Sequence, residues 1–254
     1  MNPITFTLPV AGIVYAVQES NLPGKIIVAV LFVGSVFVWS IMITKMRELG
    51  AARKASRRFL RSYRDSRTPL SLFLEREEFG ASPPFAVYDK TCSELAGLLD
   101  EENSGAEGLA SEGRHSPSSG IASRSLGVIR SVAERAVADQ ALLAEESMGL
   151  LATATTTAPF LGLLGTVWGV MEAFGGMAVT GSAMLDAVAP GISGALLTTV
   201  VGLLVALPSA IGYNTLSDRI RRLTVQTDNF SQELLADIER HYVQGGAPWH
   251  DGHR

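Results

Sequence analysis

Three long stretches of this chain carry no charged residue, and each is long enough to cross a lipid bilayer as a helix. They run from Ile26 to Ile43, from Ser147 to Met171 and from Ala187 to Ser217. About twenty mainly apolar residues in helical form cross the hydrocarbon core of a bilayer. Because hydrophobic residues also make up 47% of the 254 positions, the sequence predicts an all-α integral membrane protein. We expect three transmembrane helices with long cytoplasmic helical extensions.

The basic residues beside these stretches predict how the chain crosses the membrane, because Lys and Arg that flank a span stay on the cytoplasmic side. Nine basic residues lie between positions 45 and 67, and Arg219, Arg221 and Arg222 follow the third span. The stretch 173–185 between the second and third spans has none. The N-terminus is therefore expected outside, in the periplasm, and the C-terminus in the cytoplasm.

The predicted division of the chain follows from these spans. It has an outer segment at 1–24, transmembrane helices at 25–44, 147–172 and 186–214, a cytoplasmic helical region at 45–146, an outer loop at 173–185 and a cytoplasmic helix and tail at 215–254. The outer segment is either an interfacial helix or a loosely ordered tail. In the cytoplasmic region, Pro83 and Pro84 are expected to stop a helix, and the Gly, Ser and charged residues of 101–120 predict a mobile loop. Helix-forming residues beside the second and third spans predict that both continue uninterrupted into the cytoplasm.

Soluble-enzyme chemistry has no support in this sequence, which contains no Walker phosphate loop, no HExxH and no GxSxG. A weak metal site at His250, Asp251 and His253 is less favoured than a frayed tail. We expect no catalytic residue, no cofactor, no metal and no nucleic acid. The basic segment 45–63 is either a surface for anionic lipid headgroups or, as we prefer, a topology signal on a solvated helix face.

Small residues dominate one side of the second and third spans. Gly165 and Gly169 form a GxxxG step, and Gly202, Ala206 and Ala210 have the same spacing. In lipid, where no hydrophobic effect drives helices together, such residues let backbones approach closely. Ordinary helix packing is the favoured interpretation of these positions.

Threonines are concentrated in the second and third spans and absent from the uncharged run 26–43 of the first. The set is Thr153, Thr155, Thr156, Thr157, Thr166, Thr198 and Thr199. One threonine can satisfy itself by bonding the carbonyl four residues back. Facing rings of threonines in an oligomer would instead form a wettable path across the membrane, and we assign this role to Thr166 and Thr199.

Several short motifs lie in and beside these two spans. They are Ala158-Pro159-Phe160, Gly165-Thr166-Val167-Trp168-Gly169, Val188-Ala189-Pro190-Gly191-Ile192, Gly202-Leu203, Pro208 and Tyr213-Asn214. Together they resemble the TolQ/ExbB branch of the MotA/TolQ/ExbB proton-channel family. The resemblance is dense over about 150–230, and over the first span and the cytoplasmic region it rests on the order of segments alone.

The resemblance implies a multi-pass protein of the bacterial inner membrane that forms a homopentamer in the lipid bilayer. Two copies of a single-span TolR/ExbD-like partner would stand inside its pore. Proton flow through an aspartate of the partner, driven by the proton motive force, would power work at the cell envelope, and Thr166 and Thr199 would face the pore. The alternative is a non-conducting membrane scaffold that assembles a single-span partner. No motif distinguishes a Tol-type, a Ton-type or a motility process.

One residue departs from the family pattern, because the third-span motif carries a carboxylate where this chain has Gly194. Glu172 lies at the outer end of the second span. With a rise of about 1.5 Å per residue, it is nearly level with position 194 if Thr166 and Thr199 are level. We therefore predict that Glu172 replaces the missing acid. The alternative is an interfacial glutamate that reaches outer water, since Glu172 lies about 240° around the helix from Thr166.

Overall fold

The computed structural model describes residues 21–66, 68–110, 123–180 and 185–243, which are helical almost throughout and contain no β-strand. Three of the helices are long and apolar enough to cross a membrane, as judged by length and composition. The prediction of an all-α membrane protein with three spans is therefore confirmed.

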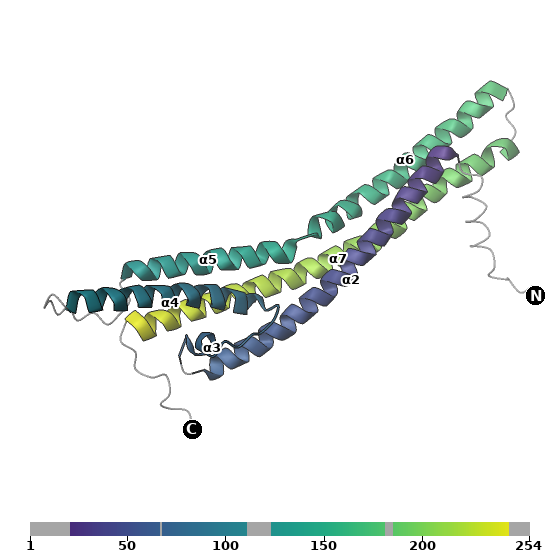
Figure 1. Cartoon of the computed structure of the whole chain (residues 1–254). Coiled ribbons are helices and arrows are strands. Elements are labelled where there is room, and N and C mark those ends of the chain that lie inside the picture. Colours follow the sequence, from purple (N-terminus) through teal and green to yellow (C-terminus); the bar gives the residue numbers. More distant parts are fainter. Residues whose placement is uncertain (1–20, 67, 111–122, 181–184, 244–254) are drawn as a thin grey trace, which may run out of the picture. The chain divides into compact units, whose positions relative to one another are not determined.

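The helices follow one another along the chain as shown in Figure 1. They are α2 (Leu22–Asp65), α3 (Ser71–Leu74), α4 (Pro83–Ala110), α5 (Ser123–Glu145), α6 (Met148–Thr180), α7 (Leu185–Ile238) and a π-helical turn η1 (Glu239–Val243). The chain forms two compact units. We call Met1–Lys45 with Ser147–Ser217 the transmembrane unit, and Met46–Glu146 with Asp218–Arg254 the extension unit. Helices α2 and α7 contribute residues to both.

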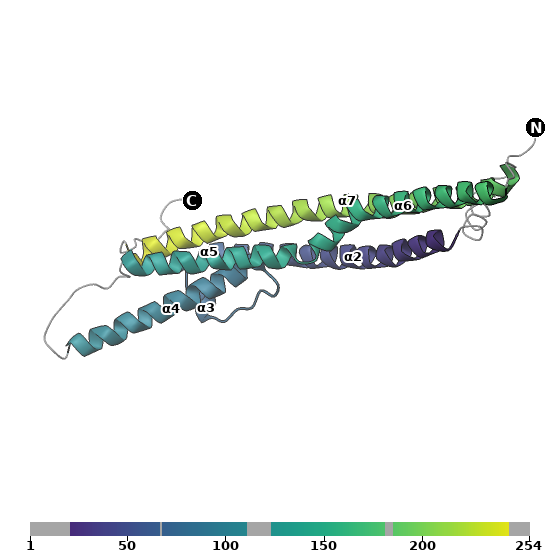
Figure 2. The same ribbon diagram turned by 90° about the horizontal axis from the view of Figure 1, so that it is seen from above.

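In the transmembrane unit, α6 and α7 lie side by side and antiparallel (Figures 1 and 2). Glycines line their contact. A Cβ atom added to Gly162, Gly165, Gly169 or Gly202 would come within 2.5 to 2.8 Å of the facing helix. Only glycine at these positions therefore allows the helices to lie so close, as the GxxxG pattern predicts. The first half of α2 packs on the pair through Leu31, which is buried with Ala158 and Ala206.

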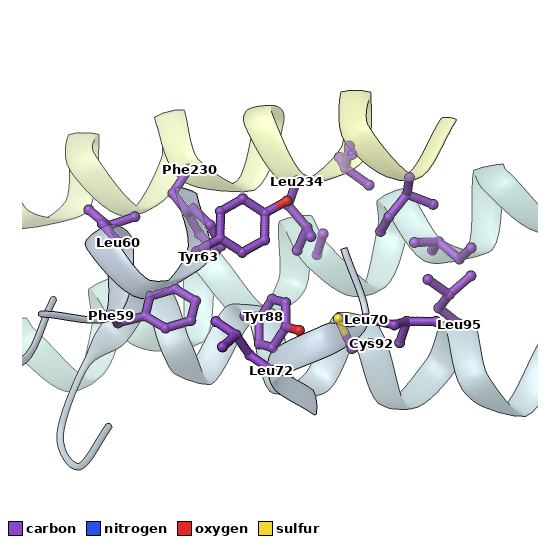
Figure 3. Packing of buried hydrophobic residues seen from close by; sticks show 14 of the residues in the cluster. Phe59, Leu60, Tyr63, Leu70, Leu72, Tyr88, Cys92, Leu95, Phe230 and Leu234 are labelled. Carbon is purple, nitrogen blue, oxygen red and sulfur yellow. The ribbon is translucent and has the colours of Figure 1, made fainter. Parts of the chain in front are cut away.

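The extension unit is built around buried aromatic rings (Figure 3). Phe59 of α2 is fully buried, and its ring centroid lies 5.1 to 5.5 Å from those of Phe79, Phe85, Tyr88 and Phe230. Tilted and edge-to-face pairs of this kind add about 0.5–1.5 kcal/mol each to the burial of apolar area. These contacts hold α2, α4 and α7 together within the unit.

Two tyrosine hydroxyl groups form hydrogen bonds within this core. The Tyr63 hydroxyl donates to Asp237 Oδ2 at 2.9 Å, and burial together with that carboxylate raises the pKa of Tyr63. The Tyr88 hydroxyl donates to the Pro69 carbonyl at 2.7 Å and accepts the Phe73 N–H at 3.0 Å. Both buried phenols therefore have partners, as buried polar groups require.

Two predicted loops are shorter than the sequence indicates. Helix α4 continues to Ala110, so the first half of the predicted mobile loop 101–120 is helical, and 111–120 lies outside the described residues. Helix α6 continues to Thr180 and α7 begins at Leu185, so most of the predicted outer loop 173–185 is helical too. Ala and Glu favour helix in the first case, and membrane helices tolerate Gly in the second.

Pro83 and Pro84, expected to stop a helix, instead begin α4. Proline has no N–H to donate, but the first N–H groups of a helix have no partner within it, so proline fits the first turn. Ser82 caps this helix, because its hydroxyl accepts the Phe85 N–H at 3.3 Å.

The uninterrupted helix predicted to lead into the second span is broken. Helix α5 ends at Glu145, Ser147 has a φ of 66°, and α6 begins at Met148. One non-glycine residue in the left-handed region is enough to end a helix. The amino-acid composition around Ser147 still favours helix, so the sequence pattern does not predict this break.

The other two spans are each part of a longer helix. Helix α7 continues beyond the third span to Ile238, as predicted. Helix α2 begins at Leu22 and joins the first span to the basic segment without a break. The predicted outer segment 1–24 is thus helical at its end, whereas 1–20 and the interfacial helix considered for it lie outside the described residues.

Candidate functional site

The hydroxyl groups of Thr166, Thr198 and Thr199 meet at the glycine-lined contact between α6 and α7. Thr166 Oγ1 lies 2.5 Å from Thr199 Oγ1 and 3.5 Å from Thr198 Oγ1. Thr166 comes from α6 and the other two from α7, so these hydroxyls connect the two helices. The structure therefore brings the predicted pair, Thr166 and Thr199, into direct contact. We call the three residues the threonine cluster.

Two backbone carbonyls complete the site. The Gly162 carbonyl lies 2.9 Å from Thr198 Oγ1 and 3.1 Å from Thr199 Oγ1, and 3.2 Å from Thr166 Oγ1. The Ala195 carbonyl lies 2.7 Å from Thr198 Oγ1 and 3.0 Å from Thr166 Oγ1. A threonine in a lone helix bonds only carbonyls of its own preceding turn. Here all three hydroxyls also reach the facing helix.

Glycine on α6 makes room for this arrangement. A Cβ atom on Gly165 would lie 2.5 Å from Thr198 Oγ1 and 2.7 Å from its Cβ. A Cβ atom on Gly162 would lie 2.8 Å from the Thr198 carbonyl oxygen. Gly165, one of the GxxxG positions, thus does more than pack helices, because its missing Cβ leaves the space that the Thr198 side chain fills.

Thr198 is the functional candidate that sequence reasoning missed. It is 1% exposed, whereas Thr166 and Thr199 are half-buried. The sequence placed it in the threonine set without distinguishing it from Thr153 or Thr156, which bond carbonyls of their own helix. The antiparallel pairing of the two spans could have indicated Thr198, since Gly165 leaves a gap opposite this residue.

Glu172 does not join the threonine cluster. Its side chain is exposed and accepts a hydrogen bond from Asn21 Nδ2 at 2.5 Å. Asn21 Oδ1 accepts the Gly24 N–H at 3.0 Å, so this residue caps α2 while it binds Glu172. At about 100° per residue, Glu172 lies about 240° around α6 from Thr166, on the side of the α2 N-terminus.

The height of Glu172 along α6 is close to that of Gly194. A Cβ on Gly169 would meet Ala195 at 2.6 Å, and a Cβ on Gly191 would meet Ala173 at 3.2 Å. In this antiparallel pairing Glu172 is level with position 192, about 3 Å along the axis from Gly194. Gly194 is buried. The two sites share a height, but the carboxylate points toward Asn21.

The other predicted motif residues lie within α6 and α7. Pro159 lies inside α6, and Pro190 and Pro208 lie inside α7, where membrane helices tolerate proline. Trp168 is exposed, and a Cβ on Gly202 would lie 2.6 Å from the Ala158 carbonyl.

Among the residues that the structure describes, no group of three or more His, Cys, Asp or Glu side chains is arranged to hold a metal ion. The tail with His250, Asp251 and His253 lies outside them.

Fold and site together define a multi-span α-helical membrane protein with a polar site between two glycine-packed spans. The sequence model of the MotA/TolQ/ExbB proton channel family matches residues 99–229, which include α6 and most of α7. The chain belongs to this family, in its TolQ/ExbB branch. With three apolar helices, it is a multi-pass protein of the bacterial inner membrane.

Individual relatives carry the names of this branch. The chain is 32% identical to the biopolymer transport protein ExbB of Pseudomonas putida over 223 residues, 88% of this chain and 62% of the relative. It is 44% identical to the Tol-Pal system protein TolQ of Pseudomonas aeruginosa over 96 residues, 38% of this chain and 42% of the relative. It is 31% identical to ExbB of Xanthomonas campestris pv. campestris strain B100 over 209 residues, 82% of this chain and 79% of the relative. The chain thus spans less than two thirds of the first two relatives.

Proposed function

We propose that this protein is the proton-channel (stator) subunit of a TolQ/ExbB-type motor in the bacterial inner membrane. With a single-span TolR/ExbD-like partner, it couples the proton motive force to work at the cell envelope. Five copies form a ring in the bilayer around two partner helices. The N-terminus lies in the periplasm and the C-terminus in the cytoplasm, because the basic segment after the first span and Arg219, Arg221 and Arg222 flank the inner ends of the spans.

The threonine cluster is the observation that carries this proposal. A hydroxyl both donates and accepts, so it can pass a proton along a hydrogen bond where an apolar side chain cannot. Thr166 and Thr199 are bonded to each other and only half-buried in the single chain. They are therefore available to water and to a partner helix on one side. Membrane helices carry such polar contacts mainly where they line a pathway or join helices.

The titrating acid of this motor comes from the partner. Within the predicted spans 25–44, 147–172 and 186–214, the carboxylates of this chain are Glu172 and Asp186, each at the outer end of its span, and the Glu172 side chain binds Asn21. The predicted replacement of the acid missing at Gly194 would require Glu172 to leave Asn21. We therefore assign the proton route to Thr166 and Thr199 with an aspartate in the partner's span.

A non-conducting scaffold is the second candidate, and the glycine at position 194 is the observation that favours it. A scaffold would keep the glycine packing of α6 against α7 and the binding of a single-span partner. It would not need the hydroxyls. The two functions are separated by asking whether the threonines can be replaced without loss of work.

The experiment is to co-express the chain with a single-span TolR/ExbD-like protein and to measure partner-dependent proton flux in liposomes. Thr166→Val and Thr199→Val each remove a hydroxyl and keep the branched shape. We expect both variants to assemble with the partner and to lose most of the flux, as does replacement of the partner's aspartate by asparagine. Thr153→Val, which removes an exposed hydroxyl bonded to its own helix, is the matched control. Full flux in both variants would show that these hydroxyls are not the proton route, whereas the absence of partner-dependent flux in the unaltered complex would support the scaffold.

A further inference from the structure

Thr198 is the most buried member of the threonine cluster. We infer that Thr198 is a positioning residue that makes Thr166 and Thr199 bond to each other and sets which of them donates. The inference rests on the proposed function of that pair as the proton route. It follows from counting the hydrogen-bond donors and acceptors at the site.

The site has fewer free carbonyl lone pairs than hydroxyl donors. The carbonyls of Gly162 and Ala195 each have two lone pairs, and in an α-helix one of them accepts the N–H four residues on. One lone pair thus remains on each carbonyl, and both lie within 3.2 Å of threonine hydroxyls. Three hydroxyl protons share these two sites. With one donor for each lone pair, the third proton must lie between two hydroxyl oxygens.

That third bond lies between Thr166 and Thr199. Their oxygens are the closest pair of hydroxyls in the cluster, at 2.5 Å, whereas Thr166 and Thr198 are 3.5 Å apart. The Thr198 hydroxyl reaches both carbonyls at 2.7 and 2.9 Å. By occupying one of them, it obliges the other two threonines to share the remaining acceptor and one mutual bond.

The carbonyl that Thr198 chooses decides the direction of this mutual bond. When Thr198 donates to Gly162, the remaining acceptor is Ala195, which only Thr166 among the pair reaches. Thr199 must then donate to Thr166. When Thr198 donates to Ala195, the Gly162 carbonyl is left, and both members of the pair reach it. The bond can then run either way. Rotation of one buried hydroxyl therefore switches the pair between a fixed and a reversible direction.

Removal of the Thr198 hydroxyl abolishes this constraint. Two protons would then face two lone pairs, with Thr166 donating to Ala195 at 3.0 Å and Thr199 donating to Gly162 at 3.1 Å. No proton would be required between the two oxygens, and at their separation two facing lone pairs repel. The pair would part, and the proton route would lose its connecting bond.

The test compares variants at this one position. The complex of the chain with its single-span partner is purified, reconstituted in liposomes with an entrapped pH-sensitive dye, and driven by a pH gradient in H₂O and in D₂O. We expect Thr198→Val to lower proton flux roughly threefold to tenfold, the effect of one net hydrogen bond, and to raise the solvent isotope effect. Thr198→Ser keeps the hydroxyl and is expected to restore most of the flux.

A matched control separates positioning from packing. Ser209 of α7 is also fully buried, and within the described part of the chain its hydroxyl bonds the Val205 carbonyl alone, at 2.6 Å, so Ser209→Ala should leave flux and isotope effect unchanged. If Thr198→Val does not assemble, the pair Thr198→Ser and Thr198→Ala, which differ by one hydroxyl, decides the question. Equal flux in these two, or wild-type flux in Thr198→Val, overturns the inference.

Failure of the inference can be told from failure of the proposed function. If the unaltered complex shows no partner-dependent flux, the proposed function falls. If Thr166→Val keeps full flux, the pair is not the route, and the positioning role of Thr198 falls with it. If Thr166→Val abolishes flux while Thr198→Val has wild-type flux and isotope effect, the route stands and only the role of Thr198 is refuted.

Discussion

Substitution of Gly202 by alanine is the sharpest test of the contact between α6 and α7. The new Cβ would lie 2.6 Å from the Ala158 carbonyl oxygen and 3.1 Å from the Gly162 Cα. Both are backbone atoms, which no rotamer change can move. Since ordinary contact for a Cβ begins at 3.4 Å, the helices must separate by about 0.8 Å at this point.

The expected loss of stability in Gly202→Ala has two parts. Overpacking of a tight contact costs typically about 1–3 kcal/mol, and a gap of about 0.5–1 Å forfeits a quarter to a half of the dispersion energy of each atom pair. A shift of about 0.8 Å would also lengthen the bond from Thr198 Oγ1 to the Gly162 carbonyl from 2.9 Å to about 3.7 Å, beyond hydrogen-bond range. We therefore expect Gly202→Ala to lower the free energy of unfolding by about 1–3 kcal/mol and to lower proton flux as well.

The assay is reversible unfolding of the purified chain in mixed micelles of increasing SDS content, followed by circular dichroism. Gly175→Ala on α6 is the matched control, because a Cβ there meets nothing within 4 Å. The control should be neutral or slightly stabilising, since alanine has the higher helix propensity. If Gly202→Ala unfolds at the same SDS fraction as Gly175→Ala, the contact described between the spans is refuted.

Three further predictions follow from other parts of the chain. Glu172→Gln keeps an acceptor for Asn21 and should retain partner-dependent activity in cells, whereas Glu172→Ala should lower that activity. Loss of activity in the glutamine variant would place the carboxylate on the proton route. Phe59→Ala should destabilise the extension unit by about 3–5 kcal/mol in denaturant unfolding, while Leu74→Ala, at a side chain 73% exposed, should change it by less than about 0.5 kcal/mol. Burial raises the pKa of Cys92, the one cysteine, from 9.0 to about 12, so its thiol should react with Ellman's reagent at pH 8 only after unfolding. This thiol does not affect the free energy of unfolding below pH 9. As the pH rises from 9 toward 12, the free energy of unfolding falls, because the unfolded state then binds fewer protons than the folded state. Fast reaction of the folded protein would contradict this burial.

The spans and the contact between Thr166 and Thr199 were predictable because membrane helices have a strong sequence signature. Uncharged runs of about twenty residues have few alternatives, and small residues at GxxxG spacing indicate where two such helices meet. The antiparallel pairing of consecutive spans then brings the two threonines to one height. Helix periodicity and length make this contact possible, and the structure supplies the equal height that the sequence analysis took as a condition.

The remaining features of the fold and the site depend on individual atomic contacts and torsion angles, which the amino-acid composition does not predict. The break at Ser147 is one φ angle, and the binding of Glu172 by Asn21 joins residues 151 positions apart. The importance of Thr198 arises because Gly165 leaves a gap opposite it. These features follow from packing in three dimensions, to which local propensity contributes little.

The carbonyl of Gly162 has a consequence for how this protein would appear in a mutational scan. All three hydroxyls of the threonine cluster approach this main-chain oxygen, yet no codon change can delete it. A scan would register it only indirectly, as intolerance at Gly165 and Gly202, and would score both as packing positions. Replacing the amide that follows Gly162 with an ester, which weakens the carbonyl as an acceptor and alters no side chain, would address that oxygen directly.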